Sequence, residues 1–430
     1  MADMSRFLKN LHGASILGIN PPVFDFTFFD LWAKPLGLLF LLDFLRRRGN
    51  SVSLIDCIAE GAKGPLPWGR SRICKGEIKK PAPFRNIPRR YHHFGLNDEA
   101  FLRRLRGQET PDYILVTSGM TYWYEGVFWA IRLLRQIFPS VPIILGGTYA
   151  RLCPGHALLS GADFIQTEPL DFDFTAPALD LYSDPGYALL LSSTGCPLHC
   201  DYCASKNLFP VFRQRPLNEV LQDLRLQMKC GRIQNGVFYD DALLYRKKER
   251  FYPLCKMLKK EFPDLAWHTP NGLSVREIDQ ECANVLMRTG FQTLRLSLES
   301  IDPSLLGRSS FKATADEFLR ALECLKRAGF DSSRIETYIL AGLPGQKASS
   351  VAETIDFVIE AGGRPKLAVF SPVPGTLSFE EAAAALPALR TEPLLGNKTA
   401  YSSYISGNLS PEEVQFLKDR TKINKANQGN

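Results

Sequence analysis

The chain has 430 residues, of which 45% are hydrophobic, and its 52 Lys and Arg residues outnumber 45 Asp and Glu residues. This length and composition exclude a mostly disordered chain and predict about two or three globular domains. The longest apolar run, residues 36–45, contains Asp43 and is shorter than the roughly 20 residues that a membrane helix requires. No apolar stretch with a cleavage site opens the chain, so we expect a cytoplasmic protein with no membrane partner.

Strands alternate with helices in the first part of the chain. The expected strands are residues 14–20, 51–57, 111–119 and 141–147, and the expected helices are residues 34–49, 125–139 and 156–168. Apolar strands separated by helices are typical of a parallel, doubly wound sheet, whose ligands bind beyond the carboxyl ends of the strands. The pattern therefore predicts an N-terminal Rossmann-type α/β domain over residues 1–170.

A basic insertion interrupts this domain at about residues 60–110. Between residues 70 and 106 there are eleven basic and three acidic residues, together with the aromatic residues Phe84, Tyr91 and Phe94. Basic segments with interleaved aromatic residues can bind nucleic acid through phosphate contacts and base stacking. The alternative is a basic loop that folds over the domain's own cleft, and the sequence leaves the role of residues 70–106 open.

A second alternation follows residues 171–187, which contain two prolines, have no sustained period and are expected to be a linker. The expected strands are residues 188–194, 235–244, 265–272, 293–300, 333–345 and 365–376, and the expected helices are 218–231, 248–263, 279–290, 314–329 and 351–363. This pattern predicts a partial (β/α)6 barrel of the TIM type over residues 188–376, with its chemistry at the carboxyl ends of the strands. Residues 377–430 are expected to form a C-terminal helical extension and a polar tail.

Three of the ten cysteines, Cys196, Cys200 and Cys203, lie directly after the first of these strands. Disulfides are rare in a reducing cytoplasm, so a tight cysteine cluster there indicates metal binding or chemistry. A buried helical stripe would also give this spacing, but the flanking Gly and Pro residues favour a loop. Structural zinc needs four ligands, and the nearest fourth candidate, His199, is adjacent to Cys200. The remaining interpretation is a 4Fe-4S cluster on three thiolates, which leaves one iron open.

The motif Cys196-x3-Cys200-x2-Cys203, with Tyr202 before the third cysteine and an apolar strand in front, resembles the signature of the radical S-adenosylmethionine (radical SAM) superfamily. The resemblance implies that the open iron chelates the amino and carboxylate groups of S-adenosylmethionine (SAM). It also implies that an electron from the reduced cluster cleaves SAM to methionine and a 5′-deoxyadenosyl radical. The chain would then be an enzyme that requires an electron donor such as flavodoxin or ferredoxin.

The same resemblance assigns residues at the other strand ends to SAM. The residues expected to bind it are Asp240, Asp241, Ser297, Glu299, Gly342, Gly345 and Ser371. The acidic pair would take the methionine ammonium, unless it is a solvated surface pair, and Ser297 and Glu299 would take the ribose hydroxyls. The two glycines would let the backbone approach adenine, and Ser371 would belong to the last wall of the cofactor site. Asn271 could face either the cofactor or the substrate.

The first domain is similar to the cobalamin-binding domain of a subgroup of this family. The resemblance implies that Ser118, Thr121, Gly146 and Gly147 line the nucleotide tail and corrin ring of cobalamin. The Asp-x-His-x-x-Gly motif does not follow the first strand, so no histidine from that motif can ligate the cobalt. The aromatic run 122–124 either walls the ligand site or belongs to the core.

Together these resemblances imply a radical SAM enzyme that uses a 4Fe-4S cluster, SAM and cobalamin, and that methylates a small molecule or a peptide. Two enzymatic alternatives remain. One is an RNA-modifying enzyme similar to methylthiotransferases, motivated by the basic insertion. The other is a radical SAM enzyme whose first domain does not bind cobalamin. A cluster-bearing electron carrier or sensor is the non-enzymatic alternative, and it would not cleave SAM.

Overall fold

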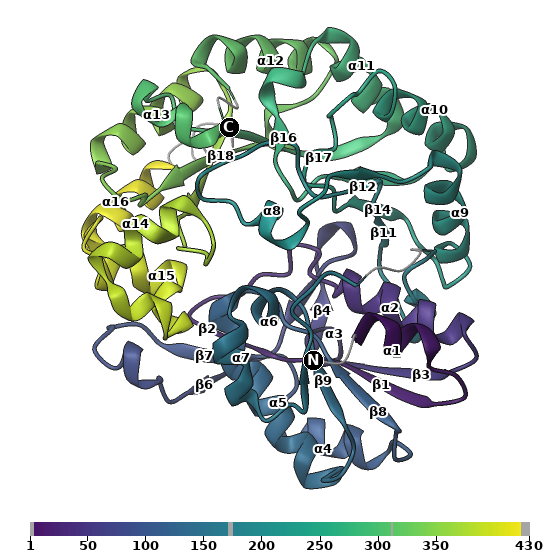
Figure 1. The fold of residues 1–430 in the computed structure, drawn as a ribbon. Helices are drawn as coiled ribbons and strands as arrows, with labels where there is room; N and C mark the ends of the chain where they lie inside the picture. The colour runs from purple at the N-terminus through teal and green to yellow at the C-terminus, as the bar shows by residue number, and fades with distance from the viewer. Residues whose placement is uncertain (1–3, 171–174, 311–312, 423–430) are drawn as a thin grey trace. The chain divides into compact units, whose positions relative to one another are not determined.

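The computed structural model describes residues 4–170, 175–310 and 313–422 (Figure 1). The chain divides into two compact units. Unit 1 contains Met1–Tyr187, Gln222–Arg232 and Leu389–Leu395, and unit 2 contains Ala188–Leu221, Ile233–Ala388 and Gly396–Asn430. The domain boundaries expected from the sequence stay predictions, and parts of the expected linker and polar tail lie outside the described residues.

Unit 1 is built on a parallel sheet with the strand order β10-β9-β8-β1-β3. Its strands are β1 (Ser15–Asn20), β3 (Ser51–Asp56), β8 (Tyr113–Val116), β9 (Ile143–Leu145) and β10 (Phe164–Ile165). Its helices include α1 (Met4–Asn10), α2 (Leu36–Arg47), α3 (Cys57–Glu60), α4 (Asp98–Arg106), α5 (Tyr124–Ile137), α6 (Thr148–Leu152) and α7 (Pro154–Ala157). Parallel strands joined through helices confirm the doubly wound class.

The helix expected over residues 156–168 is wrong over most of its length. Helix α7 ends at Ala157, and a 3-10 turn, η4 (Leu158–Ser160), follows it. Gly161 has a φ of 82°, a left-handed conformation that ends the helical segment. Residues 164–165 then form strand β10, which pairs with β9 in parallel.

The basic insertion of unit 1 is an ordered antiparallel structure. Its strands are β4 (Ala62–Pro65), β5 (Ser71–Ile73), β6 (Lys75–Ile78) and β7 (Tyr91–Phe94). Strand β7 also pairs with β2 (Val23–Asp25), which lies earlier in the chain, so the strand orders are β2-β7-β6 and β4-β5. Phe84, Tyr91 and Phe94 are at most 5% exposed, and Phe84 packs on Phe26 with ring centroids 5.0 Å apart. These aromatic rings are therefore core of the insertion and offer no exposed face for stacking on bases.

Unit 2 carries six parallel strands in chain order: β11 (Ala188–Leu190), β14 (Asn235–Phe238), β15 (Ala266–His268), β17 (Phe291–Glu299), β18 (Ile335–Ala341) and β19 (Arg364–Val369). The short β16 (Leu273–Ser274) pairs with β17. The helices that connect these strands along the chain are α9 (Leu217–Gln227), α10 (Phe251–Glu261), α11 (Gln280–Thr289), α12 (Ala315–Arg327) and α13 (Ala348–Glu360). The part of α9 from Gln222 onward belongs to unit 1. Figure 1 shows α10 to α13 outside the strands, which confirms the partial barrel.

A helical segment follows β19. It comprises α14 (Leu377–Ala385), α15 (Lys398–Ala400), the π-helical turn η12 (Tyr401–Ile405) and α16 (Pro411–Arg420). The guanidinium of Arg420 binds the carboxylate of Asp356, which fastens α16 to α13. Within the described part of the chain, no helix has the length and apolarity needed to cross a membrane.

Candidate functional site

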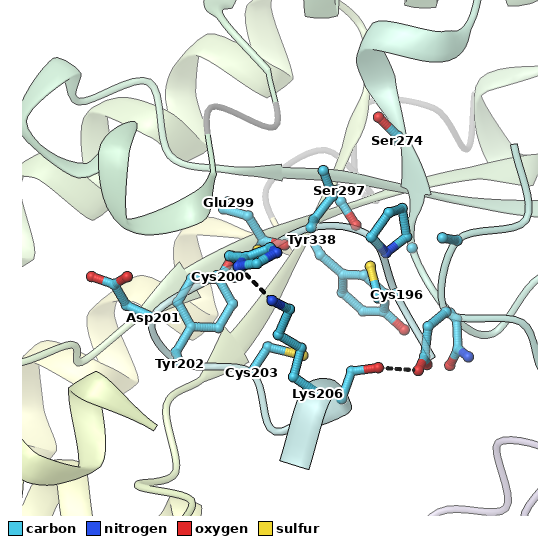
Figure 2. A pocket seen from close by; sticks show the side chains of 18 of the residues that line it. Cys196, Cys200, Asp201, Tyr202, Cys203, Lys206, Ser274, Ser297, Glu299 and Tyr338 are labelled. Carbon is cyan, nitrogen blue, oxygen red and sulfur yellow. Dashed lines mark hydrogen bonds between the residues drawn. The ribbon is translucent and has the colours of Figure 1, made fainter. Parts of the chain in front are cut away.

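Unit 2 contains a cavity of about 590 Å³ at the carboxyl ends of its strands. Its lining includes Asp241 after β14, Asn271 after β15, Glu299 at the end of β17 and Gly375 after β19. Figure 2 shows the side chains around it. This is the end of the barrel where enzymes of this architecture carry their chemistry.

The cysteine motif lies in a loop whose two ends are paired with each other. Strand β12 (Ser193–Thr194), before the motif, pairs in antiparallel with β13 (Arg213–Gln214), after it. Gly195 has a φ of 77°, and a Cβ there would lie 3.1 Å from the carbonyl oxygen of Phe209, so the turn requires glycine. The loop brings all three motif cysteines to the lining of the cavity.

The three thiols surround the cavity and do not converge on one atom. Among the described residues, no three His, Cys, Asp or Glu side chains are placed to share a single metal ion. A 4Fe-4S cluster takes each thiolate on a different iron, so cysteines around one cavity fit it. Burial raises the pKa of Cys196, and Asp241 and the other two cysteines raise it further. Its thiol therefore holds a proton near neutral pH until a metal displaces it.

The two acidic residues after β14 have different surroundings. Asp240 is buried, and its carboxylate accepts hydrogen bonds from the hydroxyls of Ser192 (2.6 Å) and Ser193 (2.7 Å) and from the Ser192 backbone N–H (3.1 Å). Asp241 lines the cavity and accepts a hydrogen bond from Ser205 Oγ at 2.5 Å. Asp240 thus fastens the start of the cysteine loop, and Asp241 is the member of the pair placed to meet a ligand.

The end of β17 supplies Ser297 and Glu299 to the cavity, beside Tyr338 of β18 (Figure 2). The pairing of β17 with β18 shifts register between Ser297 and Glu299. Glu299 has a φ of 67°, which is uncommon for a residue with a side chain. Strained backbone of this kind persists where the surrounding structure holds it, frequently at ligand sites.

The loop after β15 is packed against these strands. A Cβ on Gly272 would lie 1.8 Å from Ser297 Oγ. The hydroxyl of Tyr338 donates to the carbonyl of Pro270 (3.0 Å). The side-chain amide of Asn271 donates to the carbonyls of Tyr239 (3.0 Å) and Asp240 (3.2 Å), so this amide holds the loop after β14 in place.

Besides Asp240, three residues expected to bind SAM do not line the cavity. Gly342 has a φ of 90°, and a Cβ there would lie 2.6 Å from Ser402 Oγ, so packing on η12 explains this glycine. Gly345 has a φ of 77° and open space around it. The Ser371 hydroxyl donates to the carbonyl of Gly396 at 2.6 Å and thereby holds the C-terminal helical segment.

Other cavity residues were missed by the sequence reasoning. Nζ of Lys206 lies 2.6 Å from Nδ1 of His199, and both residues line the cavity. Figure 2 shows Lys206 there. Asn207 Nδ2 donates to the carbonyl of Gly375 (2.9 Å). Lys206 and Asn207 follow the third cysteine closely in the sequence, and this proximity could have indicated that they line the same cavity. The alternation of side chains along β18 could have indicated that Tyr338 faces the interior of the barrel.

In unit 1, the predicted cobalamin residues lie in the loops after β8 and β9. The Ser118 hydroxyl donates to the carbonyl of Gly146 at 2.6 Å. Gly147 has a φ of 91°, and a Cβ there would lie 2.4 Å from the carbonyl oxygen of Ser118. A Cβ on Gly146 would meet Gln166 Cβ at an ordinary 3.7 Å, and Thr121 is 5% exposed. The structure therefore packs the two loops closely against each other.

The aromatic run after β8 belongs largely to the core of unit 1. Tyr122 is 1% exposed and Tyr124 is 8% exposed. The indole N–H of Trp123 donates to the buried carboxylate of Asp25 at 2.9 Å, and its ring packs on the cluster of Val23, Ile58 and Phe94. Of the two interpretations left open for this run, the core accounts for these contacts.

The second part of the chain is similar to a known family. Residues 190–358 match the family described as the Radical SAM superfamily. An uncharacterized methyltransferase of Pyrococcus horikoshii is 24% identical over 210 residues, which are 48% of this chain and 44% of that protein. The ribosomal protein uS12 methylthiotransferase RimO of Geobacter sulfurreducens is 26% identical over 58% of this chain and 56% of its own length.

A solved structure shares the fold of most of the chain. It is the radical SAM methyltransferase TsrM of Kitasatospora setae with cobalamin and a [4Fe-4S] cluster bound, at a TM-score of 0.60 and 14% identity. The similarity covers 86% of this chain and 75% of TsrM. The chain spans about half the length of the curated relatives that it matches.

Proposed function

We propose that unit 2 holds a 4Fe-4S cluster on Cys196, Cys200 and Cys203 and binds SAM in the adjoining cavity. The match of residues 190–358 to the Radical SAM superfamily supports this proposal. The observation that carries the proposal is that the three cysteines share one cavity with Asp241, Ser297 and Glu299 at the carboxyl ends of the strands. Such a cluster, once reduced, supplies the electron that cleaves SAM to methionine and a 5′-deoxyadenosyl radical.

The residues of the cavity have distinct tasks in this proposal. Asp241 offers a carboxylate to the ammonium of the methionine group, and Ser297 and Glu299 offer hydrogen-bond partners to the ribose hydroxyls. Gly345 would flank the adenine, whereas Asp240, Gly342 and Ser371 would act through the loops that they hold. Tyr338 and the loop after β15 shape the wall. The protein thus orients its ligand and limits access of water, and the cofactors carry the difficult chemistry.

We further propose that unit 1 binds cobalamin at the loops that carry Ser118, Thr121, Gly146 and Gly147. The fold similarity to TsrM, which was solved with cobalamin bound, supports this assignment. The enzyme would then methylate a small molecule or a peptide and would take its electrons from a donor such as flavodoxin or ferredoxin. If unit 1 does not bind cobalamin, unit 2 still functions as a radical SAM domain.

A methylthiotransferase-like activity is the second candidate, and the similarity to RimO favours it. The methylthiotransferases that the barrel resembles carry a second cluster on three N-terminal cysteines. In unit 1, Cys57 is buried, and burial raises its pKa well above the usual range, which disfavours the thiolate that binds iron. The iron content separates the two candidates, at about four irons per chain for one cluster and about eight for two.

The experiment is anaerobic reconstitution of the full chain, followed by determination of iron and sulfide. We expect about four irons per chain, and loss of them in the triple variant with Cys196, Cys200 and Cys203 replaced by Ala. The matched control replaces Cys230 and Cys324, which lie outside the cavity lining, and should keep its iron. Stoichiometric zinc in place of iron would contradict the cluster. The reduced protein should release 5′-deoxyadenosine from SAM, and retention of hydroxocobalamin after gel filtration tests unit 1.

A further inference from the structure

Several of the contacts that hold the middle of the cysteine loop come from a segment far away in the sequence. This segment, residues 308–310, follows β17 and the 3-10 turn η7 (Pro303–Leu305) and overlaps η8 (Gly307–Ser309). Three consecutive loop residues donate to three consecutive residues of the segment. The bonds are His199 N–H to Ser310 Oγ (2.9 Å), Cys200 Sγ–H to the carbonyl of Ser309 (3.4 Å) and Asp201 N–H to the carbonyl of Arg308 (2.9 Å).

The side chain of Arg308 fixes where this segment lies. Its guanidinium donates to the carbonyl of Pro344 (3.3 Å), to Ser378 Oγ (3.0 Å) and to the carboxylate of Glu381 (2.5 Å). The backbone N–H of Ser378 in turn donates to the carbonyl of Asp201 (3.0 Å). One planar guanidinium therefore joins the loop after β18 and the start of α14 to the residues that hold the cysteine loop.

The position of Arg308 also brings a positive charge to this loop. Its side chain is 18% exposed, and Nε lies 3.8 Å from a carboxylate oxygen of Asp201. Exposed ion pairs contribute little, but a guanidinium with several partners and little exposure is held in one geometry. Both the shape of the loop and its electrostatic surroundings therefore depend on Arg308.

We propose that Arg308 is a positioning residue, which holds residues 308–310 against the cysteine loop and thereby fixes Cys200 and the charge around it. The proposal rests on the proposed function in one respect, namely that the loop holds a cluster. The effect of Arg308 on the loop can be measured without any cluster. The positioning role and the proposed function can therefore be tested separately.

The first measurement is the rate at which iodoacetamide alkylates Cys200 in the full-length apoprotein, with Cys230 as the internal reference. In Arg308→Met the segment loses the side-chain contacts that fix its position. We therefore expect alkylation of Cys200 to be about fivefold faster, which corresponds to the loss of about one hydrogen bond. Arg308→Lys keeps the charge but not the planar fork, and it should give an intermediate rate. The control Arg320→Met, at an exposed position of α12, should leave the rate unchanged.

A second variant, Ser310→Gly, tests the same contact if Arg308→Met fails to fold. Ser310 has a φ of 54°, a conformation that glycine adopts without strain. Ser310→Gly therefore removes the acceptor of the His199 N–H while it relaxes the backbone. We expect faster alkylation of Cys200 in this variant also, with the circular dichroism spectrum of the wild type.

The third measurement is the midpoint reduction potential of the reconstituted protein, followed by electron paramagnetic resonance. Loss of a positive charge beside the loop should lower this potential in Arg308→Met, whereas Arg308→Lys should stay near the wild type. Unchanged alkylation in both Arg308→Met and Ser310→Gly would overturn the positioning role. If alkylation rises as expected but the wild type assembles no cluster, the proposed function fails and the positioning role stands.

Discussion

The two parallel sheets of this protein use their strands differently. In unit 1, three successive residues of β8, Ile114, Leu115 and Val116, are all at most 3% exposed, so both faces of the strand are apolar and covered. In unit 2, β17 alternates Leu294, Leu296 and Leu298, at most 1% exposed, with Arg295, Ser297 and Glu299. Because successive side chains of a strand face opposite sides, one face of β17 is apolar and the other is polar.

The difference shows where each architecture can place chemistry. A doubly wound sheet is covered by helices on both faces, so its polar side chains lie beyond the strand ends, as Ser118 does after β8. A partial barrel has an inner face, and its strands can contribute polar side chains to a cavity directly. Polar side chains in such an interior need partners, and Glu336 of β18 provides one for both Arg295 and Lys366 at 3.0 and 3.2 Å.

The largest expected effect comes from breaking this interior group. Glu336→Gln removes the carboxylate that Arg295, whose side chain is 5% exposed, shares with Lys366. Removal of one partner of a buried ion pair costs about 3–5 kcal/mol, and we expect about 3 kcal/mol because Glu336 is 28% exposed. The midpoint of urea unfolding measures it. Glu353→Gln, at an exposed site of α13, is the control and should leave the midpoint unchanged.

The pH dependence of this effect follows from the pKa of Glu336. Burial alone would raise this pKa, but the charges and hydrogen bonds of Lys366 and Arg295 outweigh burial and lower it. A carboxyl group whose pKa is lower in the folded state stabilises the fold above its unfolded pKa and loses that contribution as the pH falls. The difference in stability between wild type and Glu336→Gln should therefore shrink as the pH falls below about 4.3, the ordinary pKa of a glutamate side chain. A difference that is constant with pH would contradict the ion pair.

The glycines of unit 1 test the other side of the comparison. Gly147→Ala places a Cβ 2.4 Å from the carbonyl oxygen of Ser118 at a φ of 91°, so we expect a loss of about 3 kcal/mol in the stability of unit 1. The neighbouring Gly146→Ala meets its first atom at 3.7 Å and should cost at most about 1 kcal/mol. Thermal unfolding measures both. Equal losses would show that the contact between the two loops does not limit stability.

The difference between Gly146 and Gly147 also determines which substitution can test the cobalamin proposal. A bulky residue at position 147 clashes with Ser118 of the protein itself, so loss of cobalamin in such a variant would report misfolding. A Trp at position 146 leaves that contact in place and is the informative variant. Loss of hydroxocobalamin retention in Gly146→Trp, with iron content unchanged, would support the assignment of these loops to the ligand.

Much of the fold could be predicted from the sequence, because hydrophobic periodicity and turn residues report local structure. The strands expected at residues 293–300 and 333–345 correspond to β17 and β18. The end of the first alternation could not be predicted, because the apolar residues near β10 fit a helix as well as a short strand, and pairing with β9 decided it.

The lining of the cavity could be predicted where it comes from one short segment, as it does for the three cysteines of the motif. The sequence could not show which of the adjacent Asp240 and Asp241 meets the cavity, because neighbouring residues point in different directions. The serine partners of Asp240, Ser192 and Ser193, come from the segment after β11, which is far away in the sequence. Arg308 gave no local signal, since its contacts with Asp201 and Ser378 are tertiary.

A smaller effect is expected where the loop after β15 packs on β17. Gly272→Ala places a Cβ 1.8 Å from Ser297 Oγ, so Ser297 must move, and we expect a loss of about 2 kcal/mol in stability with weaker binding of SAM. Ser297→Gly removes the clashing hydroxyl. The double variant should therefore recover most of the stability lost in Gly272→Ala but not the binding. Additive losses of stability in the double variant would show that the two residues do not meet.

The smallest effect separates strain from ligand binding at the end of β17. Glu299 has a φ of 67°, a conformation that costs a residue with a side chain about 1 kcal/mol and that glycine adopts freely. Glu299→Gly should therefore raise the unfolding midpoint, by about 1 kcal/mol in free energy, relative to Glu299→Ala, which keeps the side-chain strain and also removes the carboxylate. Both variants should bind SAM about tenfold more weakly in equilibrium dialysis, because each would lose the hydrogen bond proposed between a ribose hydroxyl and the Glu299 carboxylate. If Glu299→Gly is more stable than the wild type and binds more weakly, the end of this strand sacrifices stability to hold a carboxylate at the cavity. If the two variants have the same stability, the left-handed backbone carries no strain. If both variants bind SAM as tightly as the wild type does, Glu299 has no part in the ligand site.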